Sequence, residues 1–398
     1  MSQHTFNNPK IVYIVTIPLS ARILLRGQLR YMREHGFEVV VISSFGEELE
    51  AVAETEGVAV LKVPMRREIS PLHDLVSLWR LYRTLRSLKP DLVNASTPKA
   101  GFLGMLAAKM ARVPVRIYTL RGLRLETLGG LKRFVTSFTE RLASACSSQV
   151  VSVSKSLRQV YVGCSLAPAS KVVVLGEGSS NGVEVERFLP SEKNLRRSKA
   201  LRQQLGIPEG ALVVGFVGRF TRDKGITELL NASGKILDTF PETRFLLLGR
   251  LVEGDDPIPV TYVKKLEKHP RMVQVGFVPD TVPYYHLMTV LAFPSHREGL
   301  PNAPLESASA GVPVVGFDAT GTSDTVVDGA TGLLVARGDE DALAKAIIQL
   351  LGDDSLRKRM GEAARERALK YFSNEKVWER WMRLYNEALS IWSGGEKG

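Results

Sequence analysis

Two glutamates eight positions apart lie in a segment whose pattern predicts a loop that leads into a helix. Glu298 and Glu306 belong to residues 293–306, Phe-Pro-Ser-His-Arg-Glu-Gly-Leu-Pro-Asn-Ala-Pro-Leu-Glu, whose pattern predicts a strand end, a glycine-containing loop and a helix start. A loop that leads into a helix N-terminus presents free backbone N–H groups and a partial positive charge, which suit a phosphate or another anion. The alternative interpretation is that Glu298 stabilises the helix N-terminus and that Glu306 is a solvated surface charge.

Two cations follow an apolar strand earlier in the same half of the chain. Arg219 and Lys224 belong to residues 215–225, Gly-Phe-Val-Gly-Arg-Phe-Thr-Arg-Asp-Lys-Gly, which precede a predicted helix. Arginine offers a planar fork of donors and lysine a point charge, so together they could neutralise a diphosphate leaving group without a metal. The alternative is a loop whose basic side chains are merely solvated.

Several other chemistries lack their sequence signatures. The chain contains no G-x-x-x-x-G-K-[ST] run and no G-x-G-x-x-G after its first predicted strand, which argues against a Walker ATPase and a dinucleotide oxidoreductase. The six histidines show no H-E-x-x-H or comparable spacing, so we expect no metal site.

The elements that must position these residues alternate between short apolar strands and helices. This pattern predicts an α/β protein of two doubly wound, Rossmann-like domains with parallel sheets. Ligands of such sheets bind at the carboxyl ends of the strands, so two facing domains would form a cleft between two sets of strand ends. The predicted strands are 11–17, 38–43, 59–63, 91–95, 115–119 and 149–153 in the first domain, and 212–217, 244–248, 273–278, 290–294, 314–317 and 332–335 in the second.

A polar, basic run at 191–199 marks the predicted domain boundary. We therefore expect an N-terminal domain at 1–190 and a C-terminal domain at 191–374. The closing helix at 375–398 has one apolar stripe and could pack on either domain, and we allow that it joins the first.

Positive charge is concentrated in the first half. Residues 1–190 hold 25 Lys and Arg against 15 Asp and Glu, whereas residues 191–398 hold 28 against 27. A one-sided positive field attracts anionic partners such as nucleic acid, anionic lipid headgroups or a diphosphate-bearing substrate. Aromatic residues make up 7% of the chain without an interleaved basic stripe, which argues against nucleic-acid recognition.

The two motifs, in this order and about 80 positions apart in the second of two α/β domains, resemble the retaining glycosyltransferase family 4 of GT-B fold. The similarity extends over nearly the whole chain. Residues 179–183, Ser-Ser-Asn-Gly-Val, resemble the family's N-G-V/I-D element, with Glu184 where Asp is usual. Residues 320–335 resemble its G-x-x-[DE]-x-V-x-D-G-x-T-G-x-L-V segment.

The resemblance implies that the domain at 191–374 binds the nucleotide sugar and that the domain at 1–190 holds the acceptor and faces the membrane. It also implies a role for each donor-site residue. Arg219 and Lys224 would bind the nucleotide diphosphate, Glu306 the ribose hydroxyls, and Glu298 the donor sugar without acting as a covalent nucleophile. We expect catalysis from Glu298, Arg219 and Lys224, with no cofactor or metal besides the UDP-sugar co-substrate, UDP being favoured over GDP or ADP. The remaining expected donor contacts are Gly218, Gly276, Phe277, Val278, Gly299, Leu300, Pro301 and Asn302.

The acceptor side departs from the family pattern. Residues 17–22, Ile-Pro-Leu-Ser-Ala-Arg, replace a common Gly-Gly loop, and Arg121 stands where many relatives have histidine. A guanidinium stays protonated, so Arg121 could not serve as a base and should bind an anion, such as an acceptor phosphate. Ser20, Lys99 and Arg124 are further acceptor candidates. The alternative is that Arg121 and Arg124 are solvated loop charges.

A helix predicted at 72–88 carries leucines, Trp79 and Tyr82 together with Arg80, Arg83 and Arg86. A basic amphipathic helix suits an anionic membrane surface, although more often such a helix packs its apolar side into its own domain. No apolar run approaches the roughly 18–20 residues of a membrane span and residues 1–10 are polar. We therefore expect a cytoplasmic protein, peripherally associated with the inner face of the cell membrane.

Together these features favour a retaining hexosyl- or N-acetylhexosaminyltransferase. It would move a sugar from a UDP-sugar to a polyprenyl-diphosphate-linked acceptor in the assembly of a capsule, O-antigen or other surface polysaccharide. Two alternatives stay open: a UDP-sugar 2-epimerase, which would share the two-domain plan, and a non-catalytic nucleotide- or membrane-binding module.

Overall fold

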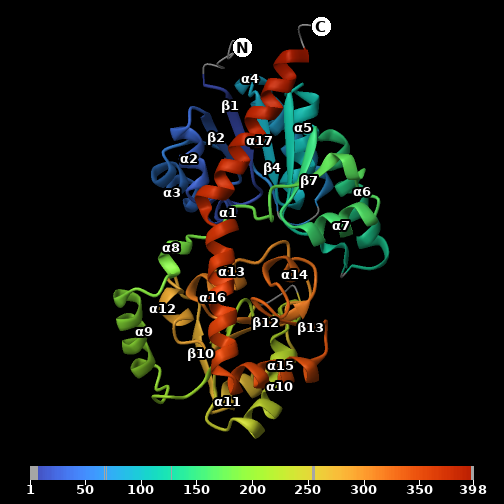
Figure 1. Cartoon of the computed structure of the whole chain (residues 1–398). Coiled ribbons are helices and arrows are strands. Elements are labelled where there is room, and N and C mark those ends of the chain that lie inside the picture. The colour runs from blue at the N-terminus through green and yellow to red at the C-terminus, as the bar shows by residue number, and fades with distance from the viewer. Residues whose placement is uncertain (1–7, 67, 69, 127, 253–255, 396–398) are drawn as a thin grey trace. The chain divides into compact units, whose positions relative to one another are not determined.

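The computed structural model describes residues 8–66, 68, 70–126, 128–252 and 256–395 and divides the chain into two compact units. The first unit contains Met1–Gly182 and Asn374–Gly398, and the second contains Val183–Ser373 (Figure 1). Each unit holds one parallel sheet covered by helices, so the predicted fold class of two doubly wound α/β domains is confirmed.

The first sheet has seven strands in the order β3-β2-β1-β4-β5-β6-β7. Neighbouring strands pair in parallel throughout. The order reverses between β1 and β4, which makes that point the topological switch of the sheet. The strands are β1 Lys10–Ile14, β2 Glu38–Ser43, β3 Ala59–Lys62, β4 Leu92–Ser96, β5 Val115–Leu120, β6 Gln149–Ser152 and β7 Val172–Val174.

The second sheet has six strands in the order β10-β9-β8-β11-β12-β13, again with parallel pairs. Its switch point lies between β8 and β11, the two strands that precede the charged loops identified in the sequence. The strands are β8 Val213–Val217, β9 Arg244–Leu248, β10 Met272–Gly276, β11 Val290–Phe293, β12 Val314–Asp318 and β13 Gly332–Ala336.

The helices of the first unit pack on both faces of its sheet. Apolar side chains of α2, α3 and α17 share one core with Ile11, Tyr13 and Val15 of the β1 segment. On the other face, α5 lies so close to the sheet that a Cβ added to Gly104 would contact Ala95 and Ile14. The helices are α1 Pro18–Leu24, α2 Gln28–Glu34, α3 Glu47–Glu56, α4 Pro71–Leu88, α5 Pro98–Met110, α6 Gly130–Cys146, α7 Lys155–Gly163 and α17 Asn374–Gly395, with 3-10 turns at Arg124–Glu126 and Ala169–Lys171.

The helices of the second unit contribute to one core on each face of its sheet, and α8, α13 and α16 share a third, smaller core. α10, α11, α15 and α16 contribute to the core on one face, and α8, α12 and α13 contribute to that on the other, with leucines of α9 packed against it. The helices are α8 Val185–Phe188, α9 Glu192–Gln204, α10 Ile226–Thr239, α11 Val260–Lys268, α12 Val282–Tyr285, α13 Asn302–Ala310, α14 Thr322–Thr325, α15 Glu340–Gly352 and α16 Asp354–Tyr371, with a 3-10 turn at Arg222–Lys224.

The division between the units lies at Gly182 and Val183, eight residues before the predicted boundary. Val183, Val185 and Phe188 are buried in cores of the second unit, which explains the shift. The polar run at 191–199 is not a linker but the first part of α9, because the Ser191 side chain accepts a hydrogen bond from Asn194 N and caps the helix. The closing helix α17 belongs to the first unit.

None of the described helices is both long and apolar enough to cross a bilayer.

Candidate active site

The two charged loops meet at the switch point of the second sheet. β8 pairs with β11, so the loops that follow these strands are neighbours although they are far apart in sequence. Gly225 has a φ of 71°, and a Cβ at this position would lie 1.8 Å from the Pro294 carbonyl oxygen. A glycine is therefore required for the loop after β8 to pack this closely against the end of β11.

Lys224 and Glu298 are in direct contact. Lys224 Nζ donates to Glu298 Oε1 at 2.5 Å, and Ser295 Oγ donates to the same oxygen at 2.8 Å. Both charged side chains are mostly buried, with exposed fractions of 17% and 15%. Glu298 precedes α13 by several residues and is paired with a lysine, so the interpretation that it merely stabilises the helix N-terminus is wrong.

Asp223 lies between two arginines beside this pair. Its carboxylate is 3.8 Å from Arg219 Nη2 and 3.9 Å from Arg297 Nη2 and accepts a 2.5 Å hydrogen bond from Thr221 Oγ1. Burial acts to raise the pKa of Asp223, but the Thr221 hydrogen bond and the nearby cations hold this pKa below its ordinary value. Three cations, Arg219, Lys224 and Arg297, therefore surround one carboxylate, and Arg219 is half exposed.

A histidine and a glutamate extend the cluster. His296 Nε2 lies 2.5 Å from Glu228 Oε1 on the first turn of α10, and the His296 backbone N–H donates to Asp223 O at 2.9 Å. Burial acts to raise the pKa of Glu228, while hydrogen bonds to His296 and Thr227 hold this pKa below its ordinary value. The sequence pattern did not reveal this pair, nor Asp223 or Arg297. Their one signal was position. Three of the four residues lie within the two charged motifs, and Glu228 follows the first motif by three residues.

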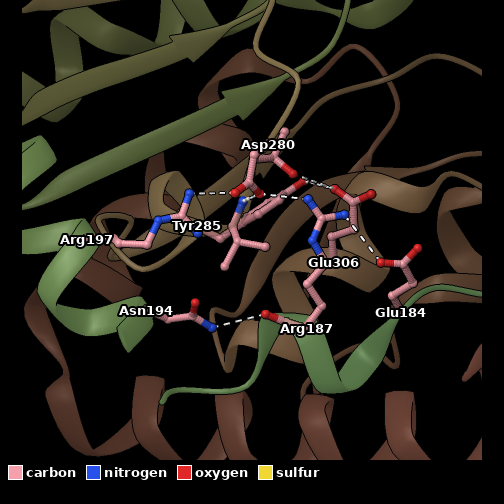
Figure 2. A network of polar contacts seen from close by, with 9 residues as sticks. Glu184, Arg187, Asn194, Arg197, Asp280, Tyr285 and Glu306 are labelled. Atoms are coloured by element: carbon pink, nitrogen blue, oxygen red, sulfur yellow. Dashed lines mark hydrogen bonds and ion pairs between the residues drawn. The ribbon is translucent and has the colours of Figure 1, made fainter. Parts of the chain in front are cut away.

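Glu306 lies on α13 and takes part in a polar network (Figure 2). Tyr285 OH donates to Glu306 Oε2 at 2.9 Å, and Thr281 Oγ1 lies 3.5 Å from the same oxygen. Burial raises the pKa of Glu306, whereas the Tyr285 hydrogen bond and the charge of Arg187 act to lower it. Glu306 is thus a largely buried carboxyl with a fixed orientation, and the interpretation as a solvated surface charge is wrong.

The same network ties the start of the second unit to the loop after β10. Arg187 Nη2 lies 2.8 Å from Asp280 Oδ1, and Arg197 Nη2 lies 2.5 Å from Asp280 Oδ2. Arg187 Nη1 also lies 3.4 Å from Glu184, the residue that replaces the usual aspartate (Figure 2). Burial acts to raise the pKa of Asp280, but its hydrogen bonds and the two arginines hold this pKa below its ordinary value.

The backbone beside these side chains suits an anion. α13 begins at Asn302, and its N-cap residue Pro301 makes no side-chain capping hydrogen bond. Gly299 and Leu300 directly precede this helix start, and the first turn of a helix presents backbone N–H groups that have no partner within the helix. Gly218 directly follows β8. Gly276 ends β10, and the Phe277 ring beside it is 78% exposed and could stack on a planar ligand.

The acceptor candidates of the first unit differ in their surroundings. Lys99 Nζ donates to both carboxylate oxygens of Asp74, at 2.7 and 3.0 Å, so its charge is already neutralised. Ser20 lies on α1, and Arg124 lies exposed in the turn Arg124–Glu126. The sequence pattern could not separate Lys99 from the others because Asp74 lies on a different helix.

Arg121 directly follows β5 and is half-buried, so it is not a solvated loop charge. Its Nε and Nη1 atoms are buried and have no hydrogen-bond partner among the described residues. Burial lowers the pKa of Arg121 to about 10, while the nearby Tyr385 and Tyr13 act to raise it. The group therefore stays a cation at neutral pH.

Within the described part of the chain, no group of three or more His, Cys, Asp or Glu residues is placed to hold a metal ion.

Known glycosyltransferase families match both units of the chain. Residues 197–367 match the family model described as glycosyl transferases group 1, and residues 22–178 match the glycosyl transferase 4-like domain. The chain is 37% identical to the capsular polysaccharide biosynthesis glycosyltransferase CapM of Staphylococcus aureus, over 96% of this chain and 98% of CapM.

Two more distant similarities have the same extent. The chain is 24% identical to a UDP-Gal:alpha-D-GlcNAc-diphosphoundecaprenol alpha-1,3-galactosyltransferase of Escherichia coli, over 96% of this chain and 97% of that protein. The crystal structure of Anabaena HepE in complex with UDP and glucose superposes with a TM-score of 0.78 at 21% identity, covering 96% of this chain and all of HepE. The similarity to HepE shows that the two chains share a fold.

Proposed function

The chain belongs to the group 1 glycosyl transferases, and from that premise we propose that it transfers a hexosyl or N-acetylhexosaminyl group from a UDP-sugar to a polyprenyl-diphosphate-linked saccharide. The observation that carries the proposal is the contact of Lys224 with Glu298 beside Arg219, at the switch point of the second sheet. The activities named for these relatives support this donor, this class of acceptor and a place in surface polysaccharide assembly.

In this proposal the cations hold the UDP diphosphate. Arg219, half exposed and only 3.8 Å from Asp223, supplies a fork of donors, and Lys224 supplies a point charge. Arg297, on the other side of Asp223, is placed to join them. The N–H groups at the start of α13 face the same phosphates. Glu306, oriented by Tyr285, accepts hydrogen bonds from the ribose, and Phe277 lies against the base.

Sugar transfer then breaks the bond between the anomeric carbon and the β-phosphate oxygen. The acceptor hydroxyl oxygen bonds to that carbon on the face that the diphosphate leaves, so the configuration is retained, and its proton passes to the departing phosphate oxygen. The fixed cations stabilise the charge that develops on the diphosphate, which makes a metal unnecessary. Glu298, held by Lys224 and Ser295, orients the sugar hydroxyls and stabilises positive charge on the ring.

The acceptor diphosphate binds Arg121 in this proposal. The two buried guanidinium nitrogens of Arg121, Nε and Nη1, are costly without a partner, and a phosphate oxygen would supply the missing acceptor. Lys99 is a weaker candidate because Asp74 neutralises it. We further propose that the enzyme works on lipid-linked acceptors at the cytoplasmic face of the membrane, peripherally bound.

The test is transfer with a panel of UDP-, GDP- and ADP-sugars and a short-chain polyprenyl-diphosphate saccharide, in buffer with and without EDTA. We expect product only with a UDP-sugar, with an unchanged anomeric configuration by NMR and no effect of EDTA. Conversion of the UDP-sugar to an epimer without any acceptor would instead identify an epimerase. UDP binding without either reaction would identify a non-catalytic module.

A further inference from the structure

Two helices of the first unit expose large apolar side chains on their outer faces. α4 exposes Leu72, Leu75, Val76 and Trp79, and α6 exposes Leu131, Phe134 and Phe138, with exposed fractions from 50% for Val76 to 81% for Leu72. We call these seven side chains the docking surface. α4 buries a different set, Ser77, Leu81 and Leu85, against the unit, so only part of its apolar side packs into its own domain.

On each helix an exposed arginine follows the last apolar residue of the docking surface. On α4 the apolar residues occupy the first half, and Arg80, Arg83 and Arg86 follow on the exposed side. The Arg83 guanidinium lies 4.8 Å from the centre of the Trp79 ring. On α6, spacings of three, four and three residues lead from Leu131 through Phe134 and Phe138 to the exposed Arg141.

Acidic side chains are missing from both exposed stripes. The acidic residues of the two helices are Asp74, which is paired with Lys99, and Glu140, which is buried and hydrogen-bonded to Tyr118 and Tyr161. Lys132 and Arg133 add positive charge at the start of α6. An apolar patch on two helices whose own exposed charges are all positive matches the chemistry of an anionic bilayer, with acyl chains below negatively charged headgroups.

The apolar halves of α4 and α6 lie at the same edge of the sheet, the one formed by the carboxyl ends of its strands. In a parallel α/β sheet each helix starts at the carboxyl end of the strand before it, and α4 follows β3 as α6 follows β5. α5 packs between the two helices. Arg121 directly follows β5 at this edge, nine residues before α6 begins. The docking surface and the Arg121 guanidinium, with its unpartnered Nε and Nη1, therefore share one edge of the first unit.

We infer that the docking surface inserts into the interface of an anionic bilayer, with the arginines of α4 and α6 at the level of the lipid headgroups. A second copy of the chain is a poor occupant, because symmetric pairing of these faces would bring the arginines together. Bound in this way, the edge that carries Arg121 faces the headgroup region, where the diphosphate of a lipid-linked acceptor lies. That last step rests on the proposed function, whereas membrane docking itself does not.

Co-sedimentation with vesicles tests the inference. The full chain is mixed at low salt with vesicles of phosphatidylcholine, with or without phosphatidylglycerol. We compare wild type with Leu75→Ser/Trp79→Ser on α4 and Phe134→Ser/Phe138→Ser on α6. Met110→Ser is the matched control, because Met110 is a 49% exposed apolar residue at the far end of α5.

Wild type and the control should bind the phosphatidylglycerol vesicles, and salt should weaken this binding. Each double variant should lose about ten- to a hundredfold in affinity, since each removes two large side chains from the interface. Unchanged binding by both double variants, or equal binding of wild type to pure phosphatidylcholine, would overturn the inference. So would a wild-type dimer in sedimentation velocity that the same substitutions dissociate while vesicle binding persists.

Two further measurements separate this inference from the proposed function. UDP binding and thermal unfolding should be the same in all variants, because the substituted residues are exposed and lie in the first unit. Transfer to a short, water-soluble acceptor should survive in the double variants, whereas transfer to an acceptor embedded in vesicles should fall. Vesicle binding as expected without any sugar transfer would refute the proposed function and leave the docking inference intact.

Discussion

The contact between Lys224 and Glu298 can be measured by a double-mutant cycle with Lys224→Met and Glu298→Gln. At the 2.5 Å separation of their charged atoms, Coulomb attraction at an effective dielectric constant of 20 is about 7 kcal/mol. The desolvation of two mostly buried charges cancels much of this attraction. What remains is the value of a charge-assisted hydrogen bond, so we expect a coupling free energy of unfolding of about 1.5–3 kcal/mol.

The assay is urea unfolding of wild type, both single variants and the double variant, with and without saturating UDP. Lys235 and Asp341 provide the control cycle, because their charged atoms are also 2.5 Å apart but their side chains are 55% and 66% exposed. Solvent screening should reduce their coupling almost to zero. UDP should lower the coupling between Lys224 and Glu298, because a diphosphate competes with Glu298 for the lysine.

Equal coupling in the two cycles would refute the argument that burial makes the contact strong. UDP affinity unchanged by Lys224→Met would refute the role of Lys224 in holding the diphosphate.

Three further predictions use other parts of the structure. Tyr285→Phe should weaken UDP binding in calorimetry roughly tenfold, since Glu306 loses the donor that orients it, with Tyr284→Phe as the control; unchanged affinity would contradict this. Arg121→Met should lower kcat/KM for a diphosphate-linked acceptor about ten- to a hundredfold and leave UDP affinity unchanged, and equal loss for a phosphate-free acceptor would contradict it. Burial raises the pKa of Glu140 to about 7. The unfolded chain therefore ionises first, and this group should cost up to about 3 kcal/mol of stability as the pH rises from about 4.5 to 7. Glu140→Gln should remove that slope from unfolding curves measured across the range, and an unchanged slope would argue against the assignment.

Strand positions and sheet type could be predicted from sequence because both depend on short apolar runs separated by helices. Twelve runs were predicted and each contains or overlaps an observed strand, whereas β7 was missed because it has three residues and little apolar length. The unit boundary was misplaced because a polar run resembles a linker unless its cap, here Ser191, is recognised.

The part of the site that depends on the order of the strands could be predicted from the sequence. Arg219, Lys224 and Glu298 follow two strands that become neighbours at a switch point, so sequence alone could suggest that they meet. The contact of Glu228 with His296 could not be foreseen, because it depends on how the first turn of α10 is oriented. The burial of Arg121 depends in the same way on the surrounding side chains, such as Tyr385 from a distant part of the chain.

The position of helix α17 at the end of the sequence affects how the chain folds during its synthesis. Val377, Trp381 and Tyr385 complete the core that covers one face of the first sheet, yet the ribosome makes them only after the whole second unit. Until α17 is made, the apolar side chains of Tyr13 and its neighbours stay exposed. The first unit therefore cannot complete its core while the second unit is synthesised and folds. A gene fragment that stops before α17 would therefore yield an aggregation-prone product, whereas fusing α17 directly behind Gly182 should restore an independently folding unit.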